Sequence, residues 1–206
     1  MNPSGREARL AGAVRAVVAG ALRDARARHL FLVDDGSPEA GVCTRWLEGA
    51  LPAGTLRRVG PPVTAGLESP LQRIRAVEAA RALARSLAAE EDGLVAGPAN
   101  RTTLLLAPRE APDDIAPLGD LWASRVSRLA GAWSGPPVVA ELAGRLGGVE
   151  HLDRALAAWA AGRPLGLARE EEARLLAALV RARLARRWPR LVPKLEGRTA
   201  WIDLGR

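Results

Sequence analysis

The feature that most constrains the fold is a short buried-strand pattern that runs directly into a polar turn and then into a helix. Residues 93–97 read Gly-Leu-Val-Ala-Gly, an apolar run closed by glycine. A Pro-Ala-Asn-Arg-Thr turn follows, and after Pro117 apolar residues from Leu118 to Trp133 recur at helical spacing. In open α/β sheets, such a turn lies at the carboxyl end of a parallel strand, where ligands bind. The stretch therefore predicts an α/β fold with a ligand-binding edge.

Strand and helix patterns alternate through the first two thirds of the chain. We expect strands at 29–33, 55–59 and 93–97. Three capping patterns indicate helix starts: Ser4 with Glu7, Ser37 with Pro38, and Ser69 with Gln72. Apolar residues recur at helical spacing after the first and third of these caps. They are Leu10, Val14, Val17, Val18 and Leu22 in the first helix, and Leu71, Ile74, Leu83 and Leu87 in the third. This alternation predicts a parallel twisted sheet flanked by helices.

The last third of the chain has a different pattern, with helices expected at about 117–133, 149–161 and 169–188. We interpret residues 1–206 as one domain. It consists of an α/β core (1–134), a C-terminal helical segment (135–188) and a tail (189–206) that we expect to lie extended on the surface. The tryptophans on these helices are expected to pack in the core or at an interface.

Composition limits the classes of partner. The net charge is +7, but nearly all basic residues are arginines scattered along helices, with Lys194 the only lysine, so nucleic-acid binding is not favoured. Cys43 is the only cysteine, which excludes an intramolecular disulfide and a cysteine-cluster metal site. With no signal-peptide pattern and no apolar run of spanning length, we expect a cytoplasmic protein without a membrane partner.

Two motifs carry a resemblance to a known family. Residues 97–103 read Gly-Pro-Ala-Asn-Arg-Thr-Thr, and residues 114–121 read Asp-Ile-Ala-Pro-Leu-Gly-Asp-Leu. They resemble the Gly-Thr-x-Asn-(Lys/Arg)-(Thr/Ser)-Glu and Asp-Ile-x-Pro-(Ile/Leu)-Gly-Asp-Leu motifs of the NAD+ synthase family. The similarity is to its ammonia-dependent synthetase domain, in the N-type ATP pyrophosphatase superfamily with an adenine nucleotide alpha-hydrolase-like fold. Residues 68–75 are similar to the family's Glu-Asn-Leu-Gln-Ala-Arg-Ile-Arg segment.

The resemblance implies a reaction and a set of site residues. In the family, ATP with Mg²⁺ adenylates the nicotinate carboxylate of deamido-NAD, and ammonia displaces AMP. Family members pair as homodimers, so we expect a homodimer here. The implied remnant of the nucleotide-binding site comprises Gly36, Ser37, Gly97, Asn100, Arg101 and Thr102. The implied substrate-binding residues are Asp114, Asp120, Arg73 and Arg75.

The chain departs from the family where phosphate and metal bind. The family's Ser-Gly-Gly-x-Asp-Ser loop is Asp-Asp-Gly-Ser-Pro-Glu at residues 34–39, which adds acids and a proline to a helix start that should hold pyrophosphate. The family's magnesium-ligating Glu is Thr103, and the Thr paired with it is Pro98. The family's Leu-Tyr-Lys-Thr-Gln-Val segment reads Leu-Trp-Ala-Ser-Arg-Val at residues 121–126. Its lysine is therefore replaced by Ala123, and the nearest basic residue, Arg125, lies two positions later.

These losses fall on binding loops and leave the strand and helix patterns readable, which favours a degenerate protein. We expect a non-catalytic binding or assembly subunit to which no cofactor is assigned, with a nucleotide, a dinucleotide or a protein as its partner. The alternative is a divergent active NAD+ synthase that uses ATP and Mg²⁺, with Asp34, Asp35 or Glu39 as metal ligands. More simply, Asp34 and Asp35 complement the helix dipole, and Asn100 braces its turn. His29 and His151 are expected to be structural.

Overall fold

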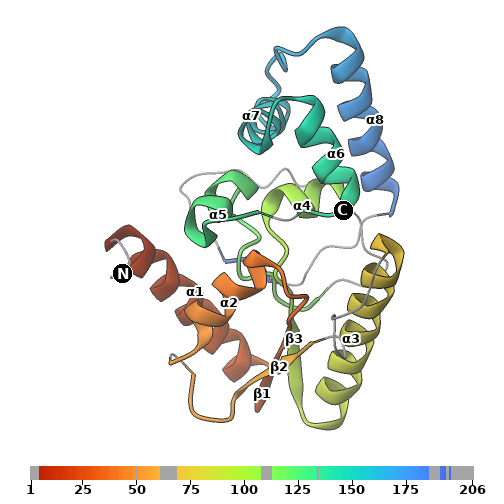
Figure 1. The fold of residues 1–206 in the computed structure, drawn as a ribbon. Coiled ribbons are helices and arrows are strands. Elements are labelled where there is room, and N and C mark those ends of the chain that lie inside the picture. The colour runs from red at the N-terminus through yellow and green to blue at the C-terminus, as the bar shows by residue number, and fades with distance from the viewer. Residues whose placement is uncertain are drawn as a thin grey trace.

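The computed structural model describes residues 5–49, 51–60, 69–107, 113–133, 135–185, 191–193 and 195. The elements are, in chain order, α1 (Gly5–Asp24), β1 (His29–Val33), α2 (Pro38–Leu47), β2 (Leu56–Val59), α3 (Pro70–Glu90), β3 (Gly93–Ala96), α4 (Arg101–Leu106), α5 (Ala123–Ala130), α6 (Pro137–Arg145), α7 (Val149–Ala160) and α8 (Arg169–Ala185). Figure 1 shows the sheet below α4 and α5, with α6, α7 and α8 stacked above them.

The three strands form a parallel sheet in the order β2-β1-β3, as the alternation of strands and helices predicts. Leu30 of β1 pairs with Leu56 of β2 and with Leu94 of β3. The expected strands are confirmed to within one residue at each end. The coarse fold class, an α/β protein with a parallel sheet flanked by helices, is therefore correct.

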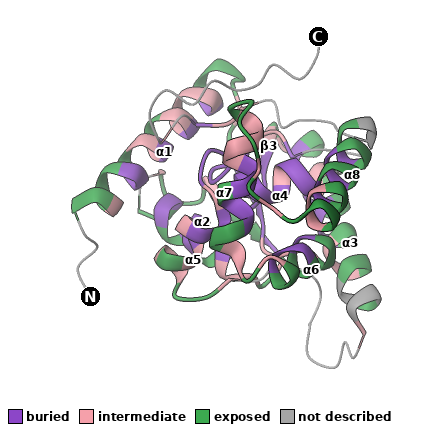
Figure 2. Cartoon of the chain, turned by 90° about the horizontal axis from the view of Figure 1, so that it is seen from above, coloured by how far each residue is buried: buried purple, intermediate pink, exposed green. Residues whose placement is uncertain are grey.

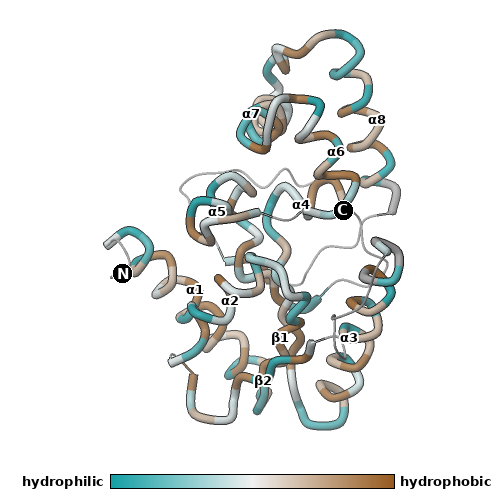
Figure 3. Tube along the Cα trace, viewed as in Figure 1, coloured by the Kyte–Doolittle hydropathy of each residue, from teal (hydrophilic) through white to brown (hydrophobic). Residues whose placement is uncertain are grey.

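The central strand β1 is buried on both faces because helices cover both sides of the sheet. Successive strand side chains point to opposite faces. Leu30 and Leu32 pack in one apolar cluster with α1 and α2, whereas Phe31 and Val33 pack in another with α3. Both pairs are fully buried, and β1 is accordingly brown in the hydropathy view of Figure 3. This two-sided burial explains the continuous apolar run in the sequence.

On one face of the sheet, α2 begins as its capping pattern predicts. Ser37 caps α2 by accepting a hydrogen bond from the N–H of Ala40, with Pro38 at the first helical position. On α1, Leu10, Val14, Val18 and Leu22 are buried as expected, while Val17 is half-buried. The expected cap at Ser4 lies outside the described residues.

Helix α3 covers the other face of the sheet. We expect its larger apolar side chains to be buried, but the buried face consists mainly of alanines. Its capping box at Ser69 and Gln72 is confirmed. However, Ile74 and Leu83 are about half exposed, at 46% and 51%, and the buried face carries Ala80, Ala84 and Ala88 with Arg81. Small residues let the helix approach the sheet, where Phe31 and Val95 supply the bulk of the contact.

The segment after Pro117 is not helical from its start, which corrects the expected helix over 117–133. Turns closed by the Gly119 N–H to Ala116 and the Leu121 N–H to Leu118 come first, and α5 begins only at Ala123. Leu118 and Leu121 are fully buried in these turns, so their apolar spacing reflects burial without a helix. The short helix α4 was not anticipated.

The C-terminal helical segment has its own apolar cluster. α4, α6, α7 and α8 contribute its buried residues, and Trp122, Trp133 and Trp159 pack against it. Packing is therefore the role of these three tryptophans, whereas Trp188 lies outside the described residues. The expected helices at 149–161 and 169–188 correspond to α7 and α8, and α6 is an additional helix. Figure 2 shows the buried residues of both layers gathered at the centre.

The edge of the sheet beside β3 is extended by single bridges instead of full strands. Ile115 forms parallel bridges with Ala96 and with Leu191. The segment from Leu191 thus returns to the α/β core, where Leu191 and Leu195 pack against the cluster of α1, β1 and α2 and Pro193 is buried. The expectation of a tail on the surface is wrong for these residues, because their backbone and apolar side chains complete the sheet edge.

Two expectations from composition can be compared with the described residues. Cys43 is a free, buried thiol, and burial together with the nearby Asp35 and Glu39 raises its pKa well above the ordinary value. Within the described ranges, no helix is both long enough and apolar enough to cross a bilayer. Cys43 is therefore a core residue of α2 and not a reactive thiol.

The close contact between α3, β1 and β3 can be tested at Gly93. A Cβ added there would lie 2.5 Å from Phe31 Cε2 and 3.2 Å from Ala88 Cα. We expect Gly93→Ala to lower the free energy of unfolding by about 1–3 kcal/mol, because overpacking a tight core forces shifts of its neighbours. Urea unfolding followed by circular dichroism measures the change.

Gly41→Ala is the matched control. Gly41 is an exposed residue within α2, and an added Cβ meets nothing within 4 Å. This substitution should stabilise the fold by about 0.5–1 kcal/mol, because glycine is a poor helix former. Equal effects of the two substitutions would contradict the packing described for Gly93.

Candidate functional site

The loop that follows β1 is the first part of the candidate site. It starts where the Asp34 N–H donates to the Val59 carbonyl at the end of β2 (2.9 Å), so it lies at the carboxyl edge of the sheet. Gly36 has a φ of 73°, a left-handed conformation that glycine adopts without strain. The chain then enters α2, and its N-terminus faces this loop. Gly36 and Ser37, the expected nucleotide-binding residues, therefore lie at a helix N-terminus, where backbone N–H groups commonly bind anions.

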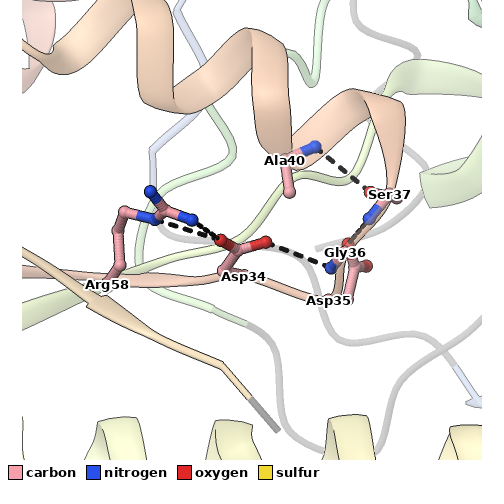
Figure 4. Close-up of polar contacts among 6 residues, drawn as sticks. All are labelled: Asp34, Asp35, Gly36, Ser37, Ala40 and Arg58. Carbon is pink, nitrogen blue, oxygen red and sulfur yellow. Dashed lines mark hydrogen bonds and ion pairs between the residues drawn. The ribbon is translucent and has the colours of Figure 1, made fainter. Parts of the chain in front are cut away.

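The amide groups of this loop are occupied by the chain's own side chains, as Figure 4 shows. The Gly36 N–H donates to Asp34 Oδ1 (3.1 Å), and the Ser37 N–H donates to Asp35 Oδ1 (3.0 Å). The Ala40 N–H donates to the Ser37 hydroxyl (3.1 Å). These N–H groups are of the kind that would hold a phosphate at a helix start. A triphosphate does not fit this arrangement, because carboxylates already accept from the amides.

The second carboxylate oxygen of Asp34 pairs with an arginine of β2. Arg58 donates from Nε (3.0 Å) and from Nη2 (2.5 Å) to Asp34 Oδ2. The Arg58 side chain is 55% exposed, so the pair contributes only about 0–1 kcal/mol to stability. Its local effect is to fix the Asp34 carboxylate at the mouth of the loop. Both oxygens of the first expected metal ligand are therefore in use.

The other expected metal ligands are not gathered into a metal-binding cluster. Asp35 accepts from the Ser37 backbone, and Glu39 is buried at 5% exposure within α2. Among the residues that the structure describes, no group of three or more His, Cys, Asp or Glu side chains could hold a metal ion. His29 contacts the Gly54 carbonyl and Glu91, and His151 is exposed on α7, so the two lie in different layers of the fold.

The turn after β3 is the second part of the candidate site, and its residues are buried. Gly97 is packed under Asp113, because an added Cβ would lie 1.8 Å from Asp113 Oδ2. Asn100 caps α4 by accepting from the Thr103 N–H (3.0 Å), as the bracing interpretation predicts. Arg101 is 6% exposed, and its guanidinium lies 4.6 Å from the centre of the Trp122 ring. This turn is a packed junction between layers.

Thr102 belongs to a hydrogen-bond network that joins the α/β core to the helical segment. Its hydroxyl donates to Asp153 Oδ1 (2.5 Å) and accepts from the Ala123 N–H (3.0 Å). The Ser124 N–H donates to Asp153 Oδ2 (2.7 Å). Asp153 of α7 thus satisfies the N-terminus of α5, which has no side-chain cap of its own. Burial raises the pKa of Asp153 above its ordinary value, and the hydrogen bonds from Ser124 and Thr102 oppose that rise.

The four residues assigned to substrate by resemblance lie on two parts of the chain, the segment 114–120 and helix α3. Asp114 accepts from the Val95 N–H of β3 (2.9 Å), and Asp120, only 2% exposed, accepts from the Leu195 N–H (2.7 Å). Arg75 is exposed in the first turns of α3, on the other face of the sheet from α1 and α2. Arg73 lies in the same helix, and its side chain lies outside the description.

Sequence reasoning missed a buried ion pair beside the turn after β3. Arg81 of α3 is 1% exposed and donates from Nε to Asp113 Oδ1 (2.8 Å) and from Nη1 to Glu78 (2.5 Å). A signal existed, because Arg81 shares a helix face with Ala84 and Ala88, where an arginine is unusual. Arg58 and Asp153 were also not assigned to any site. Each acts on a segment far away in the chain, and the local sequence does not specify such a partner.

Comparison with known proteins does not identify a family for this chain. No model of a known protein family matches the chain, and no curated protein sequence matches it either. The resemblance to NAD+ synthases therefore stays a prediction that rests on the motifs at 97–103 and 114–121.

The raised pKa of Asp153 predicts a pH dependence of stability. A carboxyl whose pKa is raised by folding contributes stability below its ordinary pKa of 3.8, and this contribution is lost as pH rises through the raised value. Asp153→Asn does not titrate. The stability of Asp153→Asn relative to the unaltered protein should therefore increase as pH rises from 3.8 through that window.

Urea unfolding of both proteins at closely spaced pH values measures this difference. Thr102→Val removes a hydrogen bond that lowers the pKa of Asp153, so it should extend the window to higher pH. A difference between Asp153→Asn and the unaltered protein that stays flat or decreases with pH would contradict the assignment.

Proposed function

We propose that the protein is a degenerate relative of the NAD+ synthases that has lost ATP-dependent amidation and acts as a non-catalytic binding or assembly subunit. The proposal is supported by the order of its elements. A parallel sheet places a helix start after β1 and a second turn after β3 at the same edge, which is where proteins of this class bind ligands. The segments that depart from the family's motifs are those at this edge.

One observation carries the proposal: the loop after β1 satisfies its own amide groups. Asp34 and Asp35 accept from Gly36 and Ser37, so acids stand where pyrophosphate would have to bind. A like-charge contact at about 4 Å costs on the order of 1–4 kcal/mol in water or near a protein surface. A phosphate would meet this repulsion and would also have to break two existing hydrogen bonds.

The turn after β3 supports the same conclusion. Arg101 and Thr102, which the resemblance assigns to the nucleotide, are buried against Trp122 and Asp153. Thr103 replaces the family's metal-ligating carboxylate and is 6% exposed on α4. A hydroxyl supplies no negative charge to Mg²⁺, so the residues present do not fit the metal that accompanies ATP in the family.

The arginine-rich composition is consistent with a solvated surface more than with a nucleic-acid site. Several arginines are paired with acids, as in Arg57 with Glu91, Arg145 with Glu141 and Arg174 with Glu170. Such pairs reduce the positive field that a phosphate backbone would require. A dinucleotide or protein ligand, within a homodimer, remains the partner that we propose.

The direct test is an amidation assay. We expect no release of AMP above a denatured control when the protein is incubated with ATP, Mg²⁺, deamido-NAD and ammonia. Calorimetric titration with Mg²⁺ and ATP should show no binding heat, because the loop amides are occupied. Turnover, or a magnesium-dependent heat, would instead favour the divergent enzyme with Asp34, Asp35 or Glu39 as metal ligands.

A second prediction tests why the loop after β1 should not bind phosphate: because its amide groups are already hydrogen-bonded, or because its carboxylates repel the phosphate. Asp34→Ser with Asp35→Gly frees the Gly36 and Ser37 amides and releases Arg58. We expect this double variant to bind pyrophosphate at least about 10-fold more tightly than the unaltered protein, because two charge-assisted hydrogen bonds become available. Calorimetry with pyrophosphate measures the affinity.

The matched control is Asp34→Asn with Asp35→Asn. This change removes both charges but keeps the side-chain oxygens that accept from the loop amides. We expect a smaller gain in affinity than in the Ser and Gly variant. An equal gain would show that repulsion alone closes the site.

A further inference from the structure

Residues 191–193 and 195, the described part of the chain after α8, form a strap that lies across the segment 114–120. The Leu191 N–H donates to the Asp114 carbonyl (2.9 Å), and the Leu191 carbonyl accepts from the Ala116 N–H (3.1 Å). Four residues later, the Leu195 N–H donates to Asp120 Oδ2 (2.7 Å). These contacts use the backbone of the strap, which is how an extended peptide binds to a sheet edge.

Within the segment 114–120, Gly119 leaves room for a side chain of the strap. Gly119 has no Cβ, and an added Cβ would lie 2.8 Å from Val192 Cγ1. Its place is thus taken by a β-branched side chain of the strap. Pro193 is buried in the next position. The surface therefore selects an extended segment with a branched residue followed by proline, in addition to its backbone contacts.

Asp120 gives this surface a charged acceptor. It is 2% exposed, and Arg101 Nη1 lies 3.9 Å from Asp120 Oδ1. The carboxylate is therefore positioned from inside the protein, with its other oxygen directed to the strap. A hydrogen bond to a buried carboxylate is stronger than one between neutral groups.

The strap is held more loosely than the strands of the sheet. Within its described residues it makes one bridge, at Leu191, whereas β1 is paired with a neighbour along both edges. Leu191, Val192 and Leu195 are only half-buried, while β1 is buried almost completely. Segments with few buried contacts open locally at lower free energy than the whole protein.

We propose that residues 114–120 form a binding site for an extended peptide strand, which the strap fills within the chain and which a strand of the same kind from another polypeptide can occupy by displacing it. The ligand donates an N–H to the Asp114 carbonyl and a second, four residues later, to Asp120. Between these two positions it carries a β-branched residue over Gly119 and then proline. The site lies apart from the loop after β1, and it stands whether or not the protein turns over ATP.

The test uses the full chain with a protease recognition sequence in place of residues 186–190, cut after purification. The strap is then held only by its contacts and can be diluted away. A fluorescent peptide of residues 189–197 should bind to the cut protein, measured by anisotropy, and should bind about 10²- to 10⁴-fold more weakly to the uncut chain, where it has to displace a tethered strap that competes at high effective concentration. Absence of binding to a folded, diluted cut protein overturns the proposal.

Amide-to-ester peptides test the contacts one at a time. An ester at Leu195 removes the N–H that Asp120 accepts, and it should weaken binding about 10- to 100-fold. An ester at Val192 is the control, because alternate residues of an extended strand direct their N–H groups to opposite sides, and its effect should be smaller. Equal affinities of the Leu195 ester and the parent peptide would overturn the assigned role of Asp120.

A measurement on the intact chain keeps the proposal testable if cutting unfolds the protein. Amide hydrogen exchange should show protection at Leu191 and Leu195, with faster exchange than in β1 because the strap opens locally. Asp120→Asn should lower protection at Leu195 more than at Leu191. Exchange of both strap amides as slow as that of β1, which requires global unfolding, would overturn the proposal.

Discussion

Aspartate carboxylates that accept backbone N–H groups hold the candidate site of this protein together. Five of them act on four segments: Asp34 on Gly36 and Asp35 on Ser37 in one loop, Asp114 on Val95, Asp120 on Leu195 and Asp153 on Ser124. Each satisfies a backbone donor that has no partner within its own helix or strand. A buried donor left unpaired costs about 1–3 kcal/mol, so the chain gains stability by closing these positions itself.

The same carboxylates account for the arrangement of the layers. Asp153 lies on α7 and completes the start of α5, which joins the helical segment to the α/β core. Asp120 does the same for the C-terminal strap, and Asp113, paired with Arg81, fills the space over Gly97. In a protein that handles nucleotides, the polar groups at such an edge face a cleft. Here they connect one element to the next, which is the physical basis for proposing a binding or assembly role.

The proposed role and the strand-binding site concern different parts of this edge. The loop after β1 is closed by side chains two residues away in sequence, so its closure is local. The segment 114–120 is closed by residues more than 70 positions away, whose described part is held by one bridge and one carboxylate contact. A cover of the second kind can be replaced by a similar strand that makes the same edge contacts, because β1, β2 and β3 pair directly with one another.

The sequence alone determined the three strands, the caps of α2 and α3 and the alternation that requires a parallel sheet, because these depend on neighbours within a few residues. It also located the polar loops at the carboxyl ends of β1 and β3. Tertiary structure decided the rest. Partners distant in the chain decided three features. Leu118 lies in a buried turn and not in a helix, Arg81 faces Asp113 and not solvent, and Leu191 of the tail pairs with Ile115. Local spacing cannot specify such partners, since hydrogen bonds and burial are completed only when the layers meet.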